Sequence, residues 1–154
     1  MRSSIQCWAL GFMLGVSLVG CSDNAWIGDV RSAQESAEQA AERGNYREAI
    51  QRLRPVAEGE LSRPARVGDS RAIRQDAFYQ LARWSLANED ATDALVFADA
   101  GLALGGDGVF RANLWVVGGQ AHEALGRSTQ AAADYHEALL INETLLDGVL
   151  GAED

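Results

Sequence analysis

One stretch decides the fold of this chain: Leu114 to Leu139, which reads LWVVGGQAHEALGRSTQAAADYHEAL. Apolar and small residues recur at helical spacing on both sides of Arg127-Ser128-Thr129. Such spacing places them on one face of each helix, so the stretch predicts two amphipathic helices that meet at a short turn. The rest of the chain repeats this unit in weaker form.

The composition limits the class of protein. The chain has 154 residues, enough for one domain with its own core, and its hydrophobic fraction of 47% contains much alanine. Alanine-rich sequences with few β-branched residues favour helices. The formal net charge of -9 argues against a nucleic-acid partner, because neutralising phosphates requires an excess of Lys and Arg.

The N-terminus has the features of a targeting segment. Met1-Arg2 is positively charged, and residues 8–19 form an apolar run too short to span a bilayer comfortably. The run ends in Leu18-Val19-Gly20-Cys21, which resembles the lipobox of bacterial lipoproteins. The resemblance implies a signal peptide (1–20), cleavage before Cys21, a lipid on its thiol, and a short tether (21–28). An uncleaved signal anchor and ordinary secretion are the alternatives.

Ser22 follows the lipobox cysteine. By resemblance to Gram-negative sorting rules, this residue favours the periplasmic face of the outer membrane, although Asp23 leaves the inner membrane open. Cleavage removes Cys7 and lipidation occupies Cys21, so we expect no disulfide and no cysteine metal site.

Residues 29–154 are expected to form three antiparallel helix pairs. Glycine and polar residues mark the breaks at Gly44-Asn45, 88–90 and 105–108. Pro55 should kink or shorten the second helix, because it removes a backbone donor and clashes with the preceding turn. The sixth helix is expected at 129–141, followed by a short apolar tail, 142–150, in which residues 144–150 would form a separate capping helix over the end of the third unit.

Self-similarity at a period of about 34 to 45 residues is typical of a helical repeat array. The third unit resembles a tetratricopeptide repeat, whose conserved positions fall on Trp115, Gly118-Gly119, His122, Ala131, Tyr135 and Ala138. The departures are Gly for Leu, His122 for an aromatic residue, and Glu143 for Pro. Successive anchor alanines are Ala49, Ala94 and Ala131.

The resemblance implies an all-α fold: a short right-handed solenoid of about three hairpins with a C-terminal capping helix. The units would span about 30–63, 75–108 and 112–145. A generic six-helix bundle with chance periodicity is the alternative.

Proteins of this family bind peptides in a groove lined by the first helix of each pair. The resemblance places the following residues in such a groove: Gln34, Glu38, Tyr79, Arg83, Asn113, Val116, Gln120 and Glu123. This mostly polar surface with one aromatic anchor suits an extended or helical segment. The alternative is that these residues only solvate the surface.

A second candidate surface is an arginine cluster within an acidic chain, formed by Arg63, Arg66, Arg71 and Arg74. Arginine binds carboxylates and phosphates in a bidentate manner, so the cluster could dock an acidic peptide or lipid head groups. Ordinary pairing with nearby Glu and Asp is the alternative.

The sequence offers little for catalysis. A metal site needs several converging ligands, and His122 and His136 are the only histidines. Residues 105–108 contain a single carboxylate, too few for a calcium loop. With no nucleophile or phosphate-loop motif, we expect no enzyme and no cofactor beyond the covalent lipid on Cys21.

These features predict a non-enzymatic, membrane-anchored protein-binding scaffold of the bacterial cell envelope that holds a protein or peptide partner in the periplasm. A pilotin-like assembly factor for a secretin, and a structural homo-oligomeric lipoprotein, are the alternatives. The partner, the pathway and the oligomeric state stay open.

Overall fold

The computed structural model of the chain describes residues 21–59, 67–106 and 108–151. These residues form six α-helices and no strand: α1 (Cys21–Glu42), α2 (Tyr46–Glu58), α3 (Val67–Ala87), α4 (Ala91–Ala103), α5 (Val109–Ala124) and α6 (Ser128–Leu150). The all-α prediction is confirmed. The expected signal peptide (1–20), Arg63 and Arg66 lie outside the described residues.

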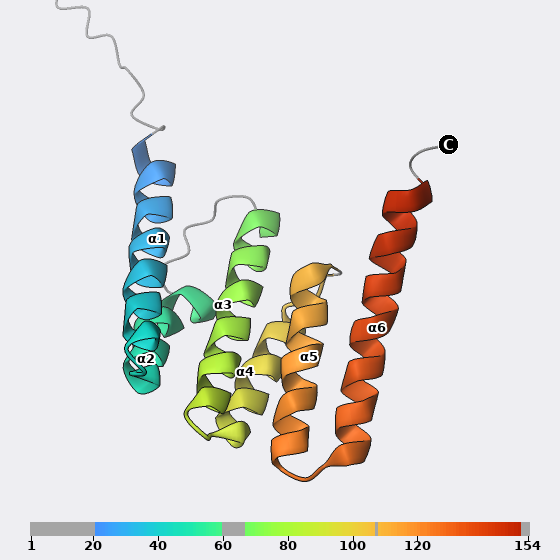
Figure 1. Cartoon of the computed structure of the whole chain (residues 1–154). Coiled ribbons are helices and arrows are strands. Elements are labelled where there is room, and N and C mark those ends of the chain that lie inside the picture. Colours follow the sequence, from blue (N-terminus) through green and yellow to red (C-terminus); the bar gives the residue numbers. More distant parts are fainter. Residues whose placement is uncertain (1–20, 60–66, 107, 152–154) are drawn as a thin grey trace, which may run out of the picture.

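The helices form an array of antiparallel pairs, α1–α2, α3–α4 and α5–α6, that lie side by side (Figure 1). Each helix packs against the next one along the chain, and α3 also packs directly against α5. The helices α1 and α3 do not pack to a comparable extent. The right-handed solenoid expected from the sequence stays a prediction.

The turns within the three pairs have the same hydrogen bonds. Backbone N–H groups of Asn45, Asp90 and Arg127 donate to carbonyl oxygens five residues earlier, at 2.9, 2.8 and 2.8 Å. The residue before each donor has a left-handed backbone: Gly44, Glu89 and Gly126, with φ of 75°, 63° and 72°. This combination is the Schellman motif, which satisfies carbonyls at a helix end.

The same turns place the three anchor alanines at equivalent positions. The N–H groups of Ala49, Ala94 and Ala131 donate to the carbonyls of Asn45, Asp90 and Arg127 at 3.0, 3.1 and 3.0 Å. All three alanines are buried. The three alanines, which are 45 and 37 residues apart in the sequence, therefore occupy equivalent positions after equivalent turns.

Small residues let the helices approach closely. A Cβ atom on Gly119 of α5 would lie 2.5 Å from the Tyr135 ring of α6. A Cβ atom on Gly101 of α4 would lie 2.7 Å from Leu114 of α5 and 2.9 Å from Phe78 of α3. These glycines are packing positions, because any larger side chain would push neighbouring helices apart.

The helix α1 begins at Cys21, well before the expected start at Asp29. Residues 21–28, expected to form a tether, are therefore helical. Trp26 and Val30 are both buried in the hydrophobic core. Their spacing of four residues places them on one face of the helix, which extends the apolar stripe of α1 toward its N-terminus.

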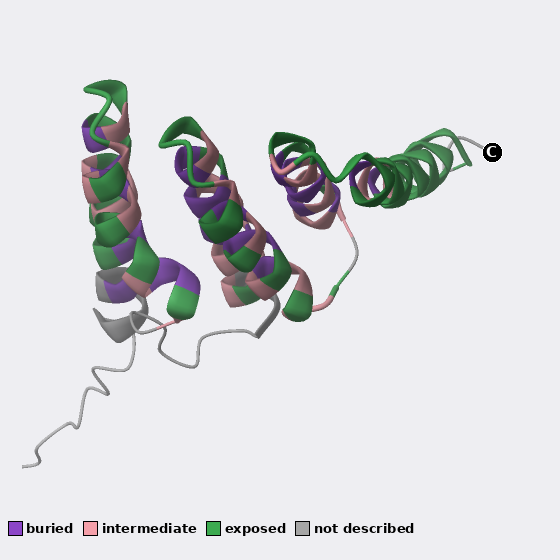
Figure 2. Cartoon of the chain, turned by 90° about the horizontal axis from the view of Figure 1, so that it is seen from below, coloured by how far each residue is buried: buried purple, intermediate pink, exposed green. Residues whose placement is uncertain are grey.

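The expectation of a separate capping helix was wrong, because α6 continues without a break to Leu150. No Gly or Pro interrupts residues 139–147, and the Thr144 hydroxyl donates to the Leu140 carbonyl within the helix at 2.9 Å. Figure 2 shows the result: buried residues lie inside the pairs, whereas the C-terminal part of α6 is exposed.

Pro55 lies inside α2, which continues for three more residues and ends at Glu58. Gly59 closes it with a left-handed backbone, and its N–H donates to the carbonyls of Pro55 and Val56. Within the described residues, no helix is both long and apolar enough to cross a membrane.

Candidate functional site

The centre of the candidate binding surface is one face of α3. Asp76, Tyr79 and Arg83 follow one another at spacings of three and four residues, so they share this face. The Arg83 guanidinium lies 5.5 Å from the centroid of the Tyr79 ring, and its Nη1 donates to Gln80 Oε1 at 3.1 Å. The stacked pair presents a cation and an aromatic face together, a combination worth about 0.5–1 kcal/mol when exposed.

Glu38 of α1, in the neighbouring helix pair, adds a second carboxylate near Asp76. Burial raises the pKa of the Asp76 carboxyl, and the charge of Glu38 raises it further, while Arg83 lowers it. Glu38 and Arg83, both predicted from the sequence, are therefore close enough to Asp76 to change its pKa. The surface carries two carboxylates and one guanidinium, with Gln34 half-buried one turn before Glu38.

The sequence analysis missed Asp76. The signal that could have found it is its helical spacing from the two predicted residues Tyr79 and Arg83 on the same face. A half-buried carboxylate with a raised pKa, next to residues of opposite and like charge, makes Asp76 a candidate functional residue.

The face of α5 differs in character. Asn113 and Val116 are half-buried, and Gln120 and Glu123 are exposed. Glu123 Oε2 accepts a hydrogen bond from the Tyr135 hydroxyl of α6 at 2.7 Å. Burial, followed by this bond, raises the pKa of Tyr135 to about 12. Glu123 therefore already has a partner within its own helix pair.

Trp115 of α5, the aromatic residue of the best-formed repeat unit, packs under a cation. The Arg111 guanidinium lies 5.9 Å from the centroid of its ring. The Nε1 atom of Trp115 is buried and has no hydrogen-bond partner among the described residues. Trp115 thus contributes to packing rather than to the exposed surface.

His122 lies in the interface of the last pair, where its Nε2 is 3.8 Å from Asp134 Oδ2. Burial raises the pKa of Asp134, His122 lowers it, and Asp99 of α4 raises it. His136 is exposed on α6. In the part of the chain that the structure describes, no group of three or more His, Cys, Asp or Glu residues is arranged to hold a metal ion.

The arginine cluster is only partly available for docking. Arg74 donates its Nε to the Ala57 carbonyl at the end of α2, at 2.9 Å. Arg71 is exposed, and its side chain lies against Gly106. Together with Ser70 and Leu104, these arginines line a hollow of about 200 Å³. Arg74 therefore joins the first two helix pairs, which sequence reasoning did not anticipate.

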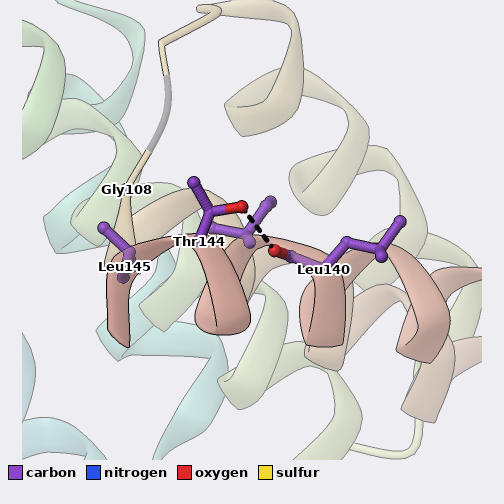
Figure 3. Close-up of a pocket in the computed structure, with 5 residues that line it drawn as sticks. Gly108, Leu140, Thr144 and Leu145 are labelled. Atoms are coloured by element: carbon purple, nitrogen blue, oxygen red, sulfur yellow. Dashed lines mark hydrogen bonds between the residues drawn. The ribbon is translucent and has the colours of Figure 1, made fainter. Parts of the chain in front are cut away.

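A further hollow, of about 330 Å³, lies between Gly108 and the C-terminal half of α6 (Figure 3). Leu140, Ile141, Thr144 and Leu145 form its α6 side. The sequence analysis missed it because it placed the end of the sixth helix at 141. The signal was the absence of any Gly or Pro between residues 141 and 147.

The chain matches no protein-family model and no curated protein sequence. The described side chains offer cationic, acidic and aromatic groups on exposed helix faces. Such groups can bind a polypeptide by hydrogen bonds, ion pairs and stacking.

Proposed function

We propose that this chain is a non-enzymatic adaptor of the bacterial cell envelope, anchored by a lipid on Cys21, which holds a periplasmic protein or peptide on the face formed by α1 and α3. The observation that carries the proposal is the cluster of Glu38, Asp76, Tyr79 and Arg83. It gathers groups of both charges and an aromatic ring where α1 and α3, which do not pack extensively on each other, belong to neighbouring helix pairs.

The chemistry of the cluster defines the segment that it would bind. Arg83 would donate hydrogen bonds to a carboxylate of the partner, since guanidinium and carboxylate groups pair in a bidentate manner. Glu38 and Asp76 would accept N–H groups from Lys, Arg or the partner's backbone. Tyr79 offers an apolar ring with a polar tip, as anchor residues in binding surfaces often do.

The lipid anchor is supported by Leu18-Val19-Gly20-Cys21, and the adaptor role by the resemblance of the third helix pair to tetratricopeptide repeats. The substitution Cys21→Ser removes the thiol that would carry the lipid. We expect this variant to leave the membrane fraction of the producing bacterium. If it stays in the membrane fraction at its full length, the N-terminal segment is a signal anchor instead.

The binding face is tested by co-purification from detergent-solubilised envelopes. We expect the double substitution Tyr79→Ala, Arg83→Glu to lose a partner that the unchanged chain retains. Arg47→Glu is a matched control, because it makes the same charge change on an exposed position of α2. Equal loss in both, or loss in neither, would contradict binding at this face.

The identity of the retained band separates the remaining alternatives. A secretin subunit that depends on Tyr79 and Arg83 would identify a pilotin-like assembly factor. Recovery of the chain with copies of itself only would identify a structural oligomer and would refute the adaptor function.

A further inference from the structure

The helix α6 lacks the second neighbour that its counterparts have. The helix α2 packs between α1 and α3, and α4 packs between α3 and α5, whereas α5 is the only principal neighbour of α6 among the described helices. Four large apolar side chains on α6 are between 54% and 69% exposed: Leu139, Leu146, Val149 and Leu150. We call these four residues the α6 stripe.

The spacing of the α6 stripe makes it a single surface. Leu139, Leu146 and Leu150 follow at intervals of seven and four residues, which places them on one side of the helix. Val149 lies beside Leu146, three residues further on. A continuous apolar strip of this kind on a helix is typical of a surface that another helix covers.

The other two pairs show what occupies the equivalent position. Ala57 of α2 and Leu102 of α4 each follow their anchor alanine by eight residues, as Leu139 does on α6. Ala57 is fully buried and Leu102 half-buried. Both are covered because the first helix of the following pair packs there, as α3 does on α2 and α5 on α4.

An arginine marks each of these two contacts. Arg74 of α3 donates to the Ala57 carbonyl at 2.9 Å, and Arg111 of α5 donates to the Leu102 carbonyl at 3.5 Å. Both arginines stand twenty residues before the anchor alanine of their own pair. The first helix of a following pair, α3 or α5, thus places a guanidinium at the C-terminal end of the helix before it, α2 or α4.

The charge of α6 extends this pattern. The sequence of α6 contains four carboxylates and no Lys or Arg, and Glu143 and Asp147 are exposed beside the stripe, four residues apart. A cation on an incoming helix would therefore meet a carboxylate as well as an apolar strip. Charges beside an apolar helix–helix contact determine which partner binds, because a partner helix with the opposite charge is favoured.

A second copy of this chain does not fit. The first helix that a following copy would offer is α1, where Asp29 stands twenty residues before Ala49, in place of Arg74 and Arg111. Asp29 is exposed and would approach Glu143. Pairing α6 with another α6 would also bring Glu143 and Asp147 together, and like charges in such contacts are unfavourable.

A membrane surface does not fit either. Helices that lie at a bilayer surface carry Lys and Arg on their polar face. The helix α6 has neither, and its carboxylates flank the apolar residues.

We propose that the α6 stripe docks an amphipathic helix of a different protein, whose apolar side is flanked by Arg or Lys. The helix would add to the array as α3 adds to α2 and α5 adds to α4. This contact is separate from the face of α1 and α3 and does not depend on the lipid anchor.

The test uses the purified full chain and two synthetic helical peptides with the same leucine stripe, one flanked by arginines and the other by glutamates. We expect the arginine peptide to bind in a fluorescence titration, and the glutamate peptide to bind at least about tenfold more weakly. Equal affinity for the two peptides, or no binding of either, overturns the proposal.

Two variants locate the contact. Leu146→Glu should weaken the arginine peptide at least about tenfold. Val96→Glu makes a similar change at a side chain of α4 that is 58% exposed, and should leave binding unchanged. Circular dichroism should show both variants as helical as the parent chain. Binding that survives Leu146→Glu overturns the proposal.

Charge reversal gives the sharpest outcome. The double substitution Glu143→Arg, Asp147→Arg should reverse the preference, so that the glutamate peptide binds more tightly than the arginine peptide. An unchanged preference overturns the role of charge.

The alternative occupants have their own signatures. Sedimentation that shows a dimer abolished by Leu146→Glu would assign the stripe to a second copy. Binding to phosphatidylcholine vesicles lost in the same variant would assign it to a membrane. Either result overturns the proposal. Tyr79→Ala with Arg83→Glu should leave peptide binding unchanged, so failure here and failure of the α1–α3 face are distinguishable.

Discussion

Leu114 and Leu146 belong to the same helix pair and have opposite environments. Leu114 of α5 is fully buried against Gly101 of α4, whereas Leu146 of α6 is 62% exposed. Both lie on apolar faces at helical spacing, so the sequence pattern does not separate them. The difference is one of position: α5 has helices on several sides, and α6 stands at the end of the array.

The second helix of each pair has an outer apolar face that is buried where the first helix of a following pair covers it. Ala57 and Leu102 are covered by the next helix, and Leu139 at the equivalent position is exposed. Repeat arrays generally need a polar terminal face for solubility. The apolar end of this array is therefore informative about what binds there.

The largest expected effect comes from truncating the two leucines. Leu114→Ala should lower the free energy of unfolding by about 2–5 kcal/mol, because it leaves a cavity in a packed site. Leu146→Ala should change it by no more than about 0.5 kcal/mol, because its side chain is largely in water. Urea denaturation followed by circular dichroism measures both. Similar losses would mean that α6 is covered in solution.

Adding one methyl group to two glycines gives effects of opposite sign. Gly101→Ala should destabilise the chain by about 1–3 kcal/mol, because the new Cβ would overlap Leu114 and Phe78. Gly148→Ala on α6 meets no atom within 4 Å and should stabilise by about 0.5–1 kcal/mol through helix propensity. The same urea experiment applies, and two changes of equal sign would refute the contrast.

The turn between α3 and α4 belongs neither to the buried face of α5 nor to the exposed face of α6. It tests whether the three turns are equivalent. Glu89 has φ of 63° where the other turns have Gly44 and Gly126. Glu89→Gly should raise the free energy of unfolding by about 1 kcal/mol, since a left-handed backbone costs a non-glycine residue about 1–2 kcal/mol. Gly126→Ala should have the opposite effect in thermal unfolding.

The smallest effect is a dependence on pH at the face between the first two pairs. Burial raises the pKa of Asp76 above 3.8, so the folded chain holds this proton more tightly than the unfolded chain. The contribution of Asp76 to stability is therefore greatest below 3.8 and is lost as pH rises through the raised pKa.

Asp76→Asn removes this contribution. Melting temperatures measured from below pH 3.8 up through the raised pKa of Asp76 should show the parent chain losing stability, relative to the variant, as pH rises. At neutral pH the variant should be at least as stable as the parent. A parent-minus-variant difference that stays constant with pH would show that Asp76 does not titrate in this range.

Much of the fold could be predicted because its signals are local. The six helices follow from spacing, and the turns at 44–45 and 88–90 follow from glycine and polar residues, whereas the third turn was predicted at 127–129 and α6 already begins at Ser128. The anchor alanines Ala49, Ala94 and Ala131 have equivalent contacts because each turn repeats the same backbone hydrogen bonds. Each of these features depends on residues a few positions apart.

The parts that escaped prediction depend on residues far apart in the chain. Tyr79 and Arg83 were named from their repeat positions, but the pKa of Asp76 depends on its approach to α1. Arg74 looked like a free cation, and its contact with Ala57 exists only because α3 packs on α2. The continuation of α6 contradicted the expected capping helix, since an apolar tail alone does not reveal whether the helix breaks before it.

Local sequence signals predict most of the helices, how they pair, and the small residues at which they approach closely, because backbone propensity and periodic burial act over one or two turns. The tertiary structure decided which apolar faces are covered. That outcome depends on which helix comes next in space, and for Leu139 and Leu146 nothing in the described chain comes next. The same primary pattern thus forms a core at Leu114 and a free surface on α6.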